Sequence, residues 1–120
     1  MFNILGGVKV LDLTTVVLGP FATQILGDFG AEVIKIENLD GDMMRAVRPG
    51  SSDEMGAVFV NCNRNKQCVA INLKTPEGKE IFYSLVKTAD AVVHNMRDKT
   101  AVKLGNGNSD IKKIKPDMVY

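Results

Sequence analysis

Apolar positions along the first third of the chain follow two different periods. Residues 8–13 form a near-continuous apolar run of strand length, which is typical of a strand buried on both faces. Residues 19–30 instead show helical spacing, opened by a Gly-Pro pair and ended by a glycine. A second apolar run, at 33–36, has strand length again. The amphipathic stripe of the predicted helix consists of Phe21, Ile25 and Phe29, with Ala22 and Leu26 beside them.

This strand–helix–strand order predicts a βαβ unit, whose crossover is almost always right-handed. The remaining pattern continues the alternation of strands and helices after a long polar loop that begins at Asn38. An α/β domain with a mostly parallel sheet and flanking helices is therefore expected. A helix capped by Ser52 is expected at 55–62, although residues 58–60 would also suit a strand. The next helix is opened by Thr75 and Pro76, and its buried stripe consists of Ile81, Phe82, Leu85 and Val86. The other expected elements are a strand at 69–73, a strand at 91–93, a helix from Asp98 to Gly105, and a short helix capped by Ser109.

The last residues, Met118 to Tyr120, again have strand character. A sheet domain seldom ends just as a strand begins, so residues 1–120 are expected to be one truncated domain, a fragment of a longer polypeptide.

Composition narrows the class of protein without naming it. The 120 residues are the size of one domain, with 45% hydrophobic and 24% charged residues and a net charge of +1. Near-neutrality argues against a nucleic-acid binder, which would normally show a basic face. The two cysteines are too few for a zinc site, and free thiols are expected. With no apolar run of membrane-spanning length and no signal-like start, a cytoplasmic protein is expected.

The first strand–helix turn limits the cofactors that the fold would bind. A dinucleotide-binding turn needs G-x-G-x-x-G, whereas TTVVLGPFA has one glycine, so NAD binding is not expected. The helix that opens at Pro20 still offers free amides to an anion. Glu37, at the end of the second strand, is interpreted as a solvated loop acid or an ion-pair partner. His94, the one histidine, is interpreted as structural rather than as a catalytic base.

Three segments that follow predicted strands point to a ligand site. They are residues 16–18, Lys74 and Asn95. Open α/β sheets bind ligands at the carboxyl ends of their strands, so these segments should border one crevice. A lysine there suits a phosphorylated small molecule.

At these residues the sequence resembles the class III CoA-transferases, the family of formyl-CoA transferase and carnitine CoA-transferase, which also contains the α-methylacyl-CoA racemases. The matching blocks are collinear and span essentially the whole chain. They are L-x-G-V-K-V-L-D-L-T, G-P-F-A-T, L-G-D-F-G-A-E-V-I-K-I-E, G-D-M-x-R, N-x-N-R-N-K, L-K-T-P-E-G, A-D-A-V-V-x-N and K-P-D-M-V-Y.

The resemblance implies a Rossmann-like domain of which this chain is only the N-terminal part, in a family whose two subunits interlock. A homodimer is therefore expected. Two positions depart from the family: Lys103 stands where an arginine is frequent, losing the bidentate fork, and Asn38 replaces a basic residue. The CoA contacts implied by position are Val16, Val17, Leu18, Ile71, Lys74, Asn95, Met96 and Lys103.

The resemblance also implies covalent catalysis by an aspartate that attacks an acyl-CoA thioester, giving a mixed anhydride and then an aspartyl-CoA thioester. That aspartate would lie beyond this chain, so no catalytic residue and no metal are assigned here, and whether the chain is an enzyme stays open. The expected function is CoA-thioester binding without transfer by the chain alone. Two alternatives remain: a racemase-type fragment, and a stand-alone module that binds a nucleotide-like ligand or a partner chain.

Overall fold

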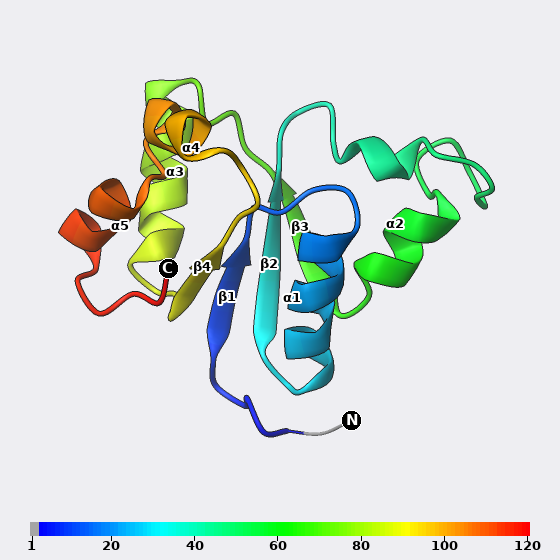
Figure 1. The fold of residues 1–120 in the computed structure, drawn as a ribbon, viewed down its shortest axis with the longest axis horizontal. Coiled ribbons are helices and arrows are strands. Elements are labelled where there is room, and N and C mark those ends of the chain that lie inside the picture. Colours follow the sequence, from blue (N-terminus) through cyan, green and yellow to red (C-terminus); the bar gives the residue numbers. More distant parts are fainter. Residues whose placement is uncertain (1–2) are drawn as a thin grey trace.

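A computed structural model describes residues 3–120 and has one four-stranded sheet in the order β3-β2-β1-β4, with every neighbouring pair parallel (Figure 1). The α/β fold expected from the sequence is confirmed. The strands are β1 (Lys9–Asp12), β2 (Glu32–Glu37), β3 (Lys66–Ala70) and β4 (Ala91–Val93).

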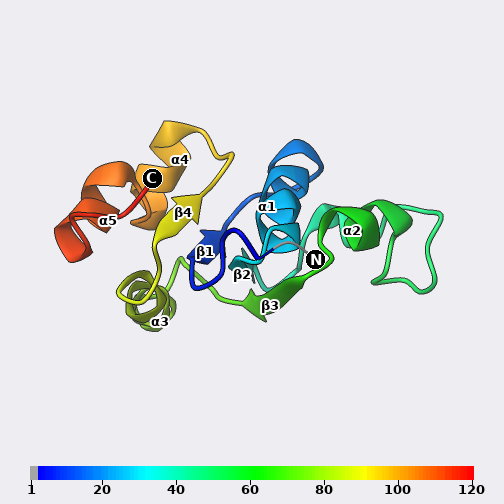
Figure 2. The same ribbon diagram turned by 90° about the horizontal axis from the view of Figure 1, so that it is seen from below.

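Helices cover both faces of the sheet. Figure 2 shows α1 and α2 on one side and α3 on the other, while α4 and α5 lie beyond β4. Within the described residues, no helix is both long and apolar enough to cross a membrane. The helices are α1 (Leu18–Asp28), the 3-10 turn η1 (Met43–Arg45), α2 (Ala57–Cys62), α3 (Pro76–Val86), α4 (Asp98–Leu104) and α5 (Asn108–Ile114).

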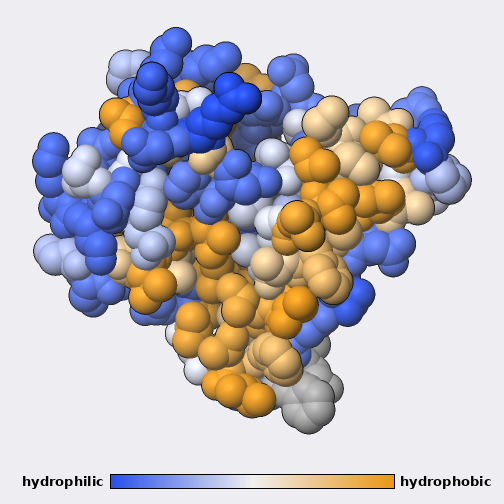
Figure 3. All heavy atoms as spheres, viewed as in Figure 1, coloured by the Kyte–Doolittle hydropathy of each residue, from blue (hydrophilic) through white to orange (hydrophobic). Residues whose placement is uncertain are grey.

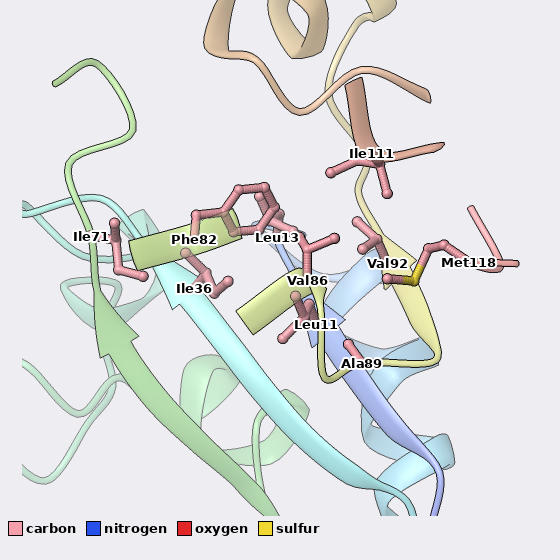
Figure 4. Close-up of a cluster of buried hydrophobic side chains, with 10 residues drawn as sticks. All are labelled: Leu11, Leu13, Ile36, Ile71, Phe82, Val86, Ala89, Val92, Ile111 and Met118. Atoms are coloured by element: carbon pink, nitrogen blue, oxygen red, sulfur yellow. The ribbon is translucent and has the colours of Figure 1, made fainter. Parts of the chain in front are cut away.

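The α3 face of the sheet holds an apolar core. Thr75 caps α3 by accepting a hydrogen bond from the Gly78 amide at 3.1 Å, and Pro76 is its first residue, both as expected. Phe82 and Val86 point from α3 into the cluster, whereas Ile81 is 55% exposed, so only part of the expected stripe is buried. Figure 4 shows the cluster: Leu11, Leu13, Ile36, Ile71, Phe82, Val86, Ala89, Val92, Ile111 and Met118.

The α1 face is packed differently. The buried residues of α1 are Pro20, Thr23, Gln24 and Gly27, which are polar or small. The apolar stripe of the helix instead faces outward: Phe21, Ile25 and Phe29 are 49%, 38% and 37% exposed. Figure 3 shows an orange, apolar area of the surface over α1 and below it.

The boundaries of two elements differ from those expected. β3 begins at Lys66, before the expected start at Val69, because the strand pairs with β2 from Val33 onward and the Lys66 ammonium is neutralised inside the protein. α2 exists, but it begins at Ala57 after a Gly56 N-cap, so Ser52 does not cap it.

The C-terminal helices are present with other caps. α4 has Arg97 and α5 has Gly107 at the N-cap position, so Asp98 and Ser109 lie inside their helices. The strand character of the last residues is confirmed, since the Val119 amide donates to Asp90 O at 3.0 Å and Val119 O accepts from the Val92 amide at 2.9 Å.

Candidate ligand-binding site

Because the strands are parallel, their carboxyl ends meet at one edge of the sheet, where the arrowheads lie in Figure 1. A cavity of about 460 Å³ opens there, within the size range of small-molecule sites. Its wall comes from the segments that follow three strands, together with two residues from the β4 side. The lining residues are Leu13, Thr15, Ile36, Glu37, Asn38, Leu39, Asp40, Gly41, Asp42, Ile71, Asn72, Leu73, Lys74, Met96 and Leu104.

Three of the residues expected to contact a ligand line this cavity. Ile71 is buried at its base, Met96 is half-buried, and Lys74 is exposed at its rim. They come from segments after β3 and β4, as the strand-end interpretation predicts.

The other expected residues lie outside the cavity lining. Val16, Val17 and Leu18 are 39%, 39% and 83% exposed where the β1–α1 loop runs into α1. Lys103 is exposed in the last turn of α4, next to the lining residue Leu104.

Asn95 holds the β1–α1 loop rather than the cavity wall. Its Oδ1 accepts a hydrogen bond from the Thr15 amide at 3.1 Å, and its Nδ2 donates to Thr15 O at 2.9 Å. Thr15 itself lines the cavity. The segment after β4 therefore positions the segment after β1.

The β1–α1 loop is tightly folded. Val16 has a left-handed backbone with φ of 74°, which is unusual for a β-branched residue and needs support from its surroundings. Gly19 is required because a Cβ there would lie 2.5 Å from Thr14 Cβ.

Beneath this loop lies a buried ionic pair between Asp12 and Lys66, 2.9 Å apart, with both side chains fully buried. Asp12 Oδ1 also accepts from the Thr14 amide and hydroxyl at 2.9 and 2.5 Å, and Oδ2 accepts from the Thr23 hydroxyl at 2.6 Å. Lys66 Nζ donates to Pro20 O at 2.8 Å. Burial lowers the pKa of Lys66, and the neighbouring Asp12 offsets part of that shift.

A second buried pair joins Lys35 and Asp42. Their side chains are fully buried, and Lys35 Nζ lies 3.0 Å from Asp42 Oδ2 while it donates to Thr14 O at 2.8 Å. Beside it, Glu37 is held by Arg45 through two hydrogen bonds of 2.8 and 2.6 Å. Of the two interpretations of Glu37, the ion-pair partner is confirmed.

Burial alone would raise the pKa of Glu37, but hydrogen bonds from the Arg45 side chain and the Asp42 amide hold it below its ordinary value. Two of the acidic residues at the cavity, Glu37 and Asp42, are therefore neutralised by neighbouring cations. Within residues 3–120, neither Asp40 nor Lys74 forms an ion pair. Lys74 therefore remains available to an anionic ligand.

The sequence interpretation did not single out Asp12 or Lys35, and it treated Lys66 as a solvated charge, which is wrong because that side chain is fully buried. One signal was present: Lys35 interrupts the otherwise apolar run V-I-K-I of a strand expected to be buried. A lysine in such a place is almost never fully buried unless it is paired. The identity of its partner, Asp42, could not be read from the sequence.

The remaining candidates for chemistry have structural roles or none. His94 Nδ1 accepts from the Met96 amide at 3.2 Å, and its ring centroid lies 5.1 Å from that of Tyr120, which agrees with a structural histidine. Cys62 is buried and Cys68 exposed, and both are free. Among residues 3–120, no group of three or more histidine, cysteine or acidic side chains is placed to hold a metal ion.

These features define an open parallel α/β domain with a small-molecule cavity at the carboxyl edge of its sheet. The sequence profile of CoA-transferase family III matches residues 5–120. The chain belongs to this family.

Individual relatives agree with this assignment. The chain is 39% identical to a succinyl-CoA:mesaconate CoA-transferase of Haloarcula marismortui and 43% identical to a succinyl-CoA:glutarate CoA-transferase of Mus musculus, in each case over 97% of this chain. It spans 30% and 27% of the length of these two relatives.

Solved structures match the fold as well. A CAIB/BAIF family protein from Brucella suis superposes with a TM-score of 0.93 at 35% identity, covering 100% of this chain and 33% of that one. A hypothetical protein from Mycobacterium tuberculosis gives a TM-score of 0.88 at 38% identity, covering 96% of this chain and 32% of that one.

Proposed function

We propose that this chain is the CoA-thioester-binding N-terminal domain of a CoA-transferase that moves CoA between carboxylic acids. The observation that carries the proposal is the cavity at the carboxyl edge, which brings Ile71, Lys74 and Met96 together from separate segments. The Lys74 ammonium is the group that would meet a CoA phosphate, while Ile71 and Met96 supply apolar contact.

The other proposed contacts surround this core. Val16, Val17 and Leu18 lie at the opening of α1, and Asn95 acts through Thr15. Lys103 adds a positive charge near Leu104. CoA is a substrate in this proposal, and no metal takes part.

The transfer step itself would need a carboxylate nucleophile. The family resemblance assigns that role to an aspartate that these 120 residues do not contain. The chain by itself should therefore bind CoA without transferring it. Since the two relatives described above are named as CoA-transferases, they favour transfer over racemisation.

Calorimetric titration of the 120-residue chain with free CoA tests this function. We expect saturable binding, weakened by about 10- to 100-fold in Lys74→Ala, since a hydrogen bond to a charged group contributes roughly 1.5–3 kcal/mol. Lys87→Ala is the matched control, because it removes the same charge at the far end of α3. A folded chain that releases no heat with CoA would refute the proposal and favour a module that binds another partner.

We also propose that the chain associates with a second copy through the exposed apolar stripe of α1 formed by Phe21, Ile25 and Phe29. A contiguous apolar surface of this kind is unusual on a monomer and commonly marks a protein interface.

A further inference from the structure

Two loops line the cavity, and one buried side chain connects them. The β1–α1 loop contributes Thr15 to the lining, and the β2–η1 loop contributes Asp42. Lys35, from the middle of β2, reaches both: its Nζ donates to Thr14 O at 2.8 Å and lies 3.0 Å from Asp42 Oδ2.

The Asp42 end of this connection is itself fixed. Its other oxygen, Oδ1, accepts the Met44 amide at 3.0 Å and so caps η1, while its own amide donates to Glu37 Oε2 at 2.7 Å. A shift of Asp42 would therefore move the end of the β2–η1 loop together with the start of η1. Because the Lys35 ammonium contacts both Asp42 and the Thr14 carbonyl, it fixes the distance between the β2–η1 loop and the β1–α1 loop.

The β1–α1 loop needs such external support. Val16 holds a left-handed backbone that a valine does not favour by itself. The first turn of α1, which follows the loop, is held by Lys66, which donates to Pro20 O at 2.8 Å, and the middle of the loop is held by the Asn95 side-chain amide. Lys35 supplies the tie at its near end.

Stability alone does not explain a fully buried lysine at this position. An apolar side chain of similar length would fill the space without the desolvation penalty of an ammonium and a carboxylate. The ammonium instead donates a hydrogen bond to a carbonyl of one loop and forms a close ion pair with a carboxylate of the other. Such contacts select one loop geometry where an apolar side chain would tolerate several.

We propose that Lys35 is a positioning residue that sets the β1–α1 loop against the β2–η1 loop and so preorganises the cavity for its ligand. As regards the identity of that ligand, the proposal rests on the proposed CoA-binding function. The geometry of the loop does not depend on that function.

The test is a paired substitution, Lys35→Met with Asp42→Asn. Methionine fills the space of the lysine stem, and asparagine removes the carboxylate charge while it keeps an oxygen for the Met44 amide. Lys9→Met with Glu32→Gln is the matched control, because it removes another pair between β1 and β2 that lies 3.5 Å apart but is partly exposed, at 28% and 47%.

Two measurements are made on the same proteins. Methyl NMR follows Val16, Val17 and Leu18, with Leu11 and Val92 as reporters of the core, and calorimetry follows free CoA. We expect the loop methyls of the Lys35 variant to shift or split into several sets while the core methyls stay in place. If the competent loop geometry falls to about one tenth of the population, the CoA dissociation constant rises about 10-fold. The control should match the parent chain in both readouts.

Loop methyls and CoA affinity that stay unchanged in the Lys35 variant would overturn the proposal. A parent chain that does not bind CoA would refute the proposed function, yet the methyl spectra would still decide the role of Lys35. If the paired variant does not fold, Asp42→Asn alone gives the answer, since it weakens the same tie and should perturb the loop methyls in the same direction. Core and loop methyls that move equally in Asp42→Asn would also overturn the proposal.

Discussion

The two faces of this sheet are packed differently, although the α1 face also holds a small apolar cluster of Val10, Ala31 and Val33. On the α3 face, Phe82 and Val86 meet an apolar cluster and are almost completely buried. On the α1 face, the fully buried side chains include Asp12, Lys35 and Lys66, and the helix turns its aromatic residues outward. Figure 4 shows the apolar cluster, and Figure 3 shows the apolar surface over α1.

This difference in packing indicates that the two faces have different roles, one in stability and one in shaping the candidate site. Apolar packing on the α3 side is non-directional and stabilises the fold in proportion to the area it buries. The ionic pairs on the α1 side contribute little net stability, but they contact Thr14 in the loop beside the cavity and Pro20 in the first turn of the helix that follows it. The α3 face therefore holds the domain together, and the α1 face holds the candidate site in shape.

The largest expected effect comes from truncating the apolar core. Phe82→Ala should lower the free energy of unfolding by about 3–5 kcal/mol, because the lost ring leaves a cavity in a fully packed cluster. Urea denaturation measures this. Ile81→Ala on the exposed side of the same helix is the control and should stay within about 0.5 kcal/mol. Equal losses in both variants would contradict the packing described here.

Removing one ion from the α1 face should lower the free energy of unfolding slightly less than Phe82→Ala does. A second substitution should recover part of this loss. Lys66→Met leaves Asp12 buried without its cation, at about 3 kcal/mol. Adding Asp12→Asn should recover part of that loss, because the asparagine carries no charge and still offers an acceptor to Thr14. A double-mutant cycle in urea checks this. Strictly additive losses would show that the two side chains do not act as a pair.

A smaller effect, dependent on pH, is expected at Glu37. Its folded pKa lies below the ordinary value of 4.5, so the stabilisation by Arg45 is complete above that value and is lost as pH falls through the folded pKa. Glu37→Gln should cost about 1.5 kcal/mol at pH 7 and less as the medium becomes more acid. Urea unfolding across this pH range measures the difference. A loss that is constant with pH would show that the charge on Glu37 is not responsible.

The smallest effect on the free energy of unfolding is expected for a substitution in the exposed stripe of α1, which should instead weaken the proposed dimer. Phe21→Ser changes a half-exposed residue and should alter the free energy of unfolding by less than about 1 kcal/mol. It should nevertheless shift the chain from dimer to monomer in sedimentation velocity, since it places a hydroxyl in the exposed stripe. Ile81→Ser, on the α3 side, is the control and should leave the dimer intact. A parent chain that is monomeric at all concentrations would refute the proposed self-association.

The sequence predicted the α3 side of the molecule better than the α1 side. The signals for α3 are local: Thr75 and Pro76 at its start, and Phe82 and Val86 at helical spacing. On the α1 side the decisive contacts are distant, since Asp12 meets Lys66 across 54 positions of the chain. Charged residues at core positions look like surface residues until such partners are known, which is why the start of β3 was missed.

The candidate site was predicted only in outline for the same reason. The strand-end argument gave Lys74 and the family resemblance gave Ile71 and Met96, and all three line the cavity. Residues 16–18 follow β1 in the chain, but the tight loop turns them away from the cavity wall and leaves Thr15 there instead. That outcome depends on the Asn95 contacts, which no local pattern indicates.

Asn95 uses both ends of one side-chain amide on the backbone of a single residue, as a neighbouring strand would. Aspartate has no donor for the Thr15 carbonyl, and glutamine carries its amide one methylene too far. Among the common side chains only asparagine offers a donor and an acceptor side by side at this reach. As the sequence drifts over evolutionary time, exposed positions such as Lys87 can exchange freely, whereas position 95 has no equivalent replacement.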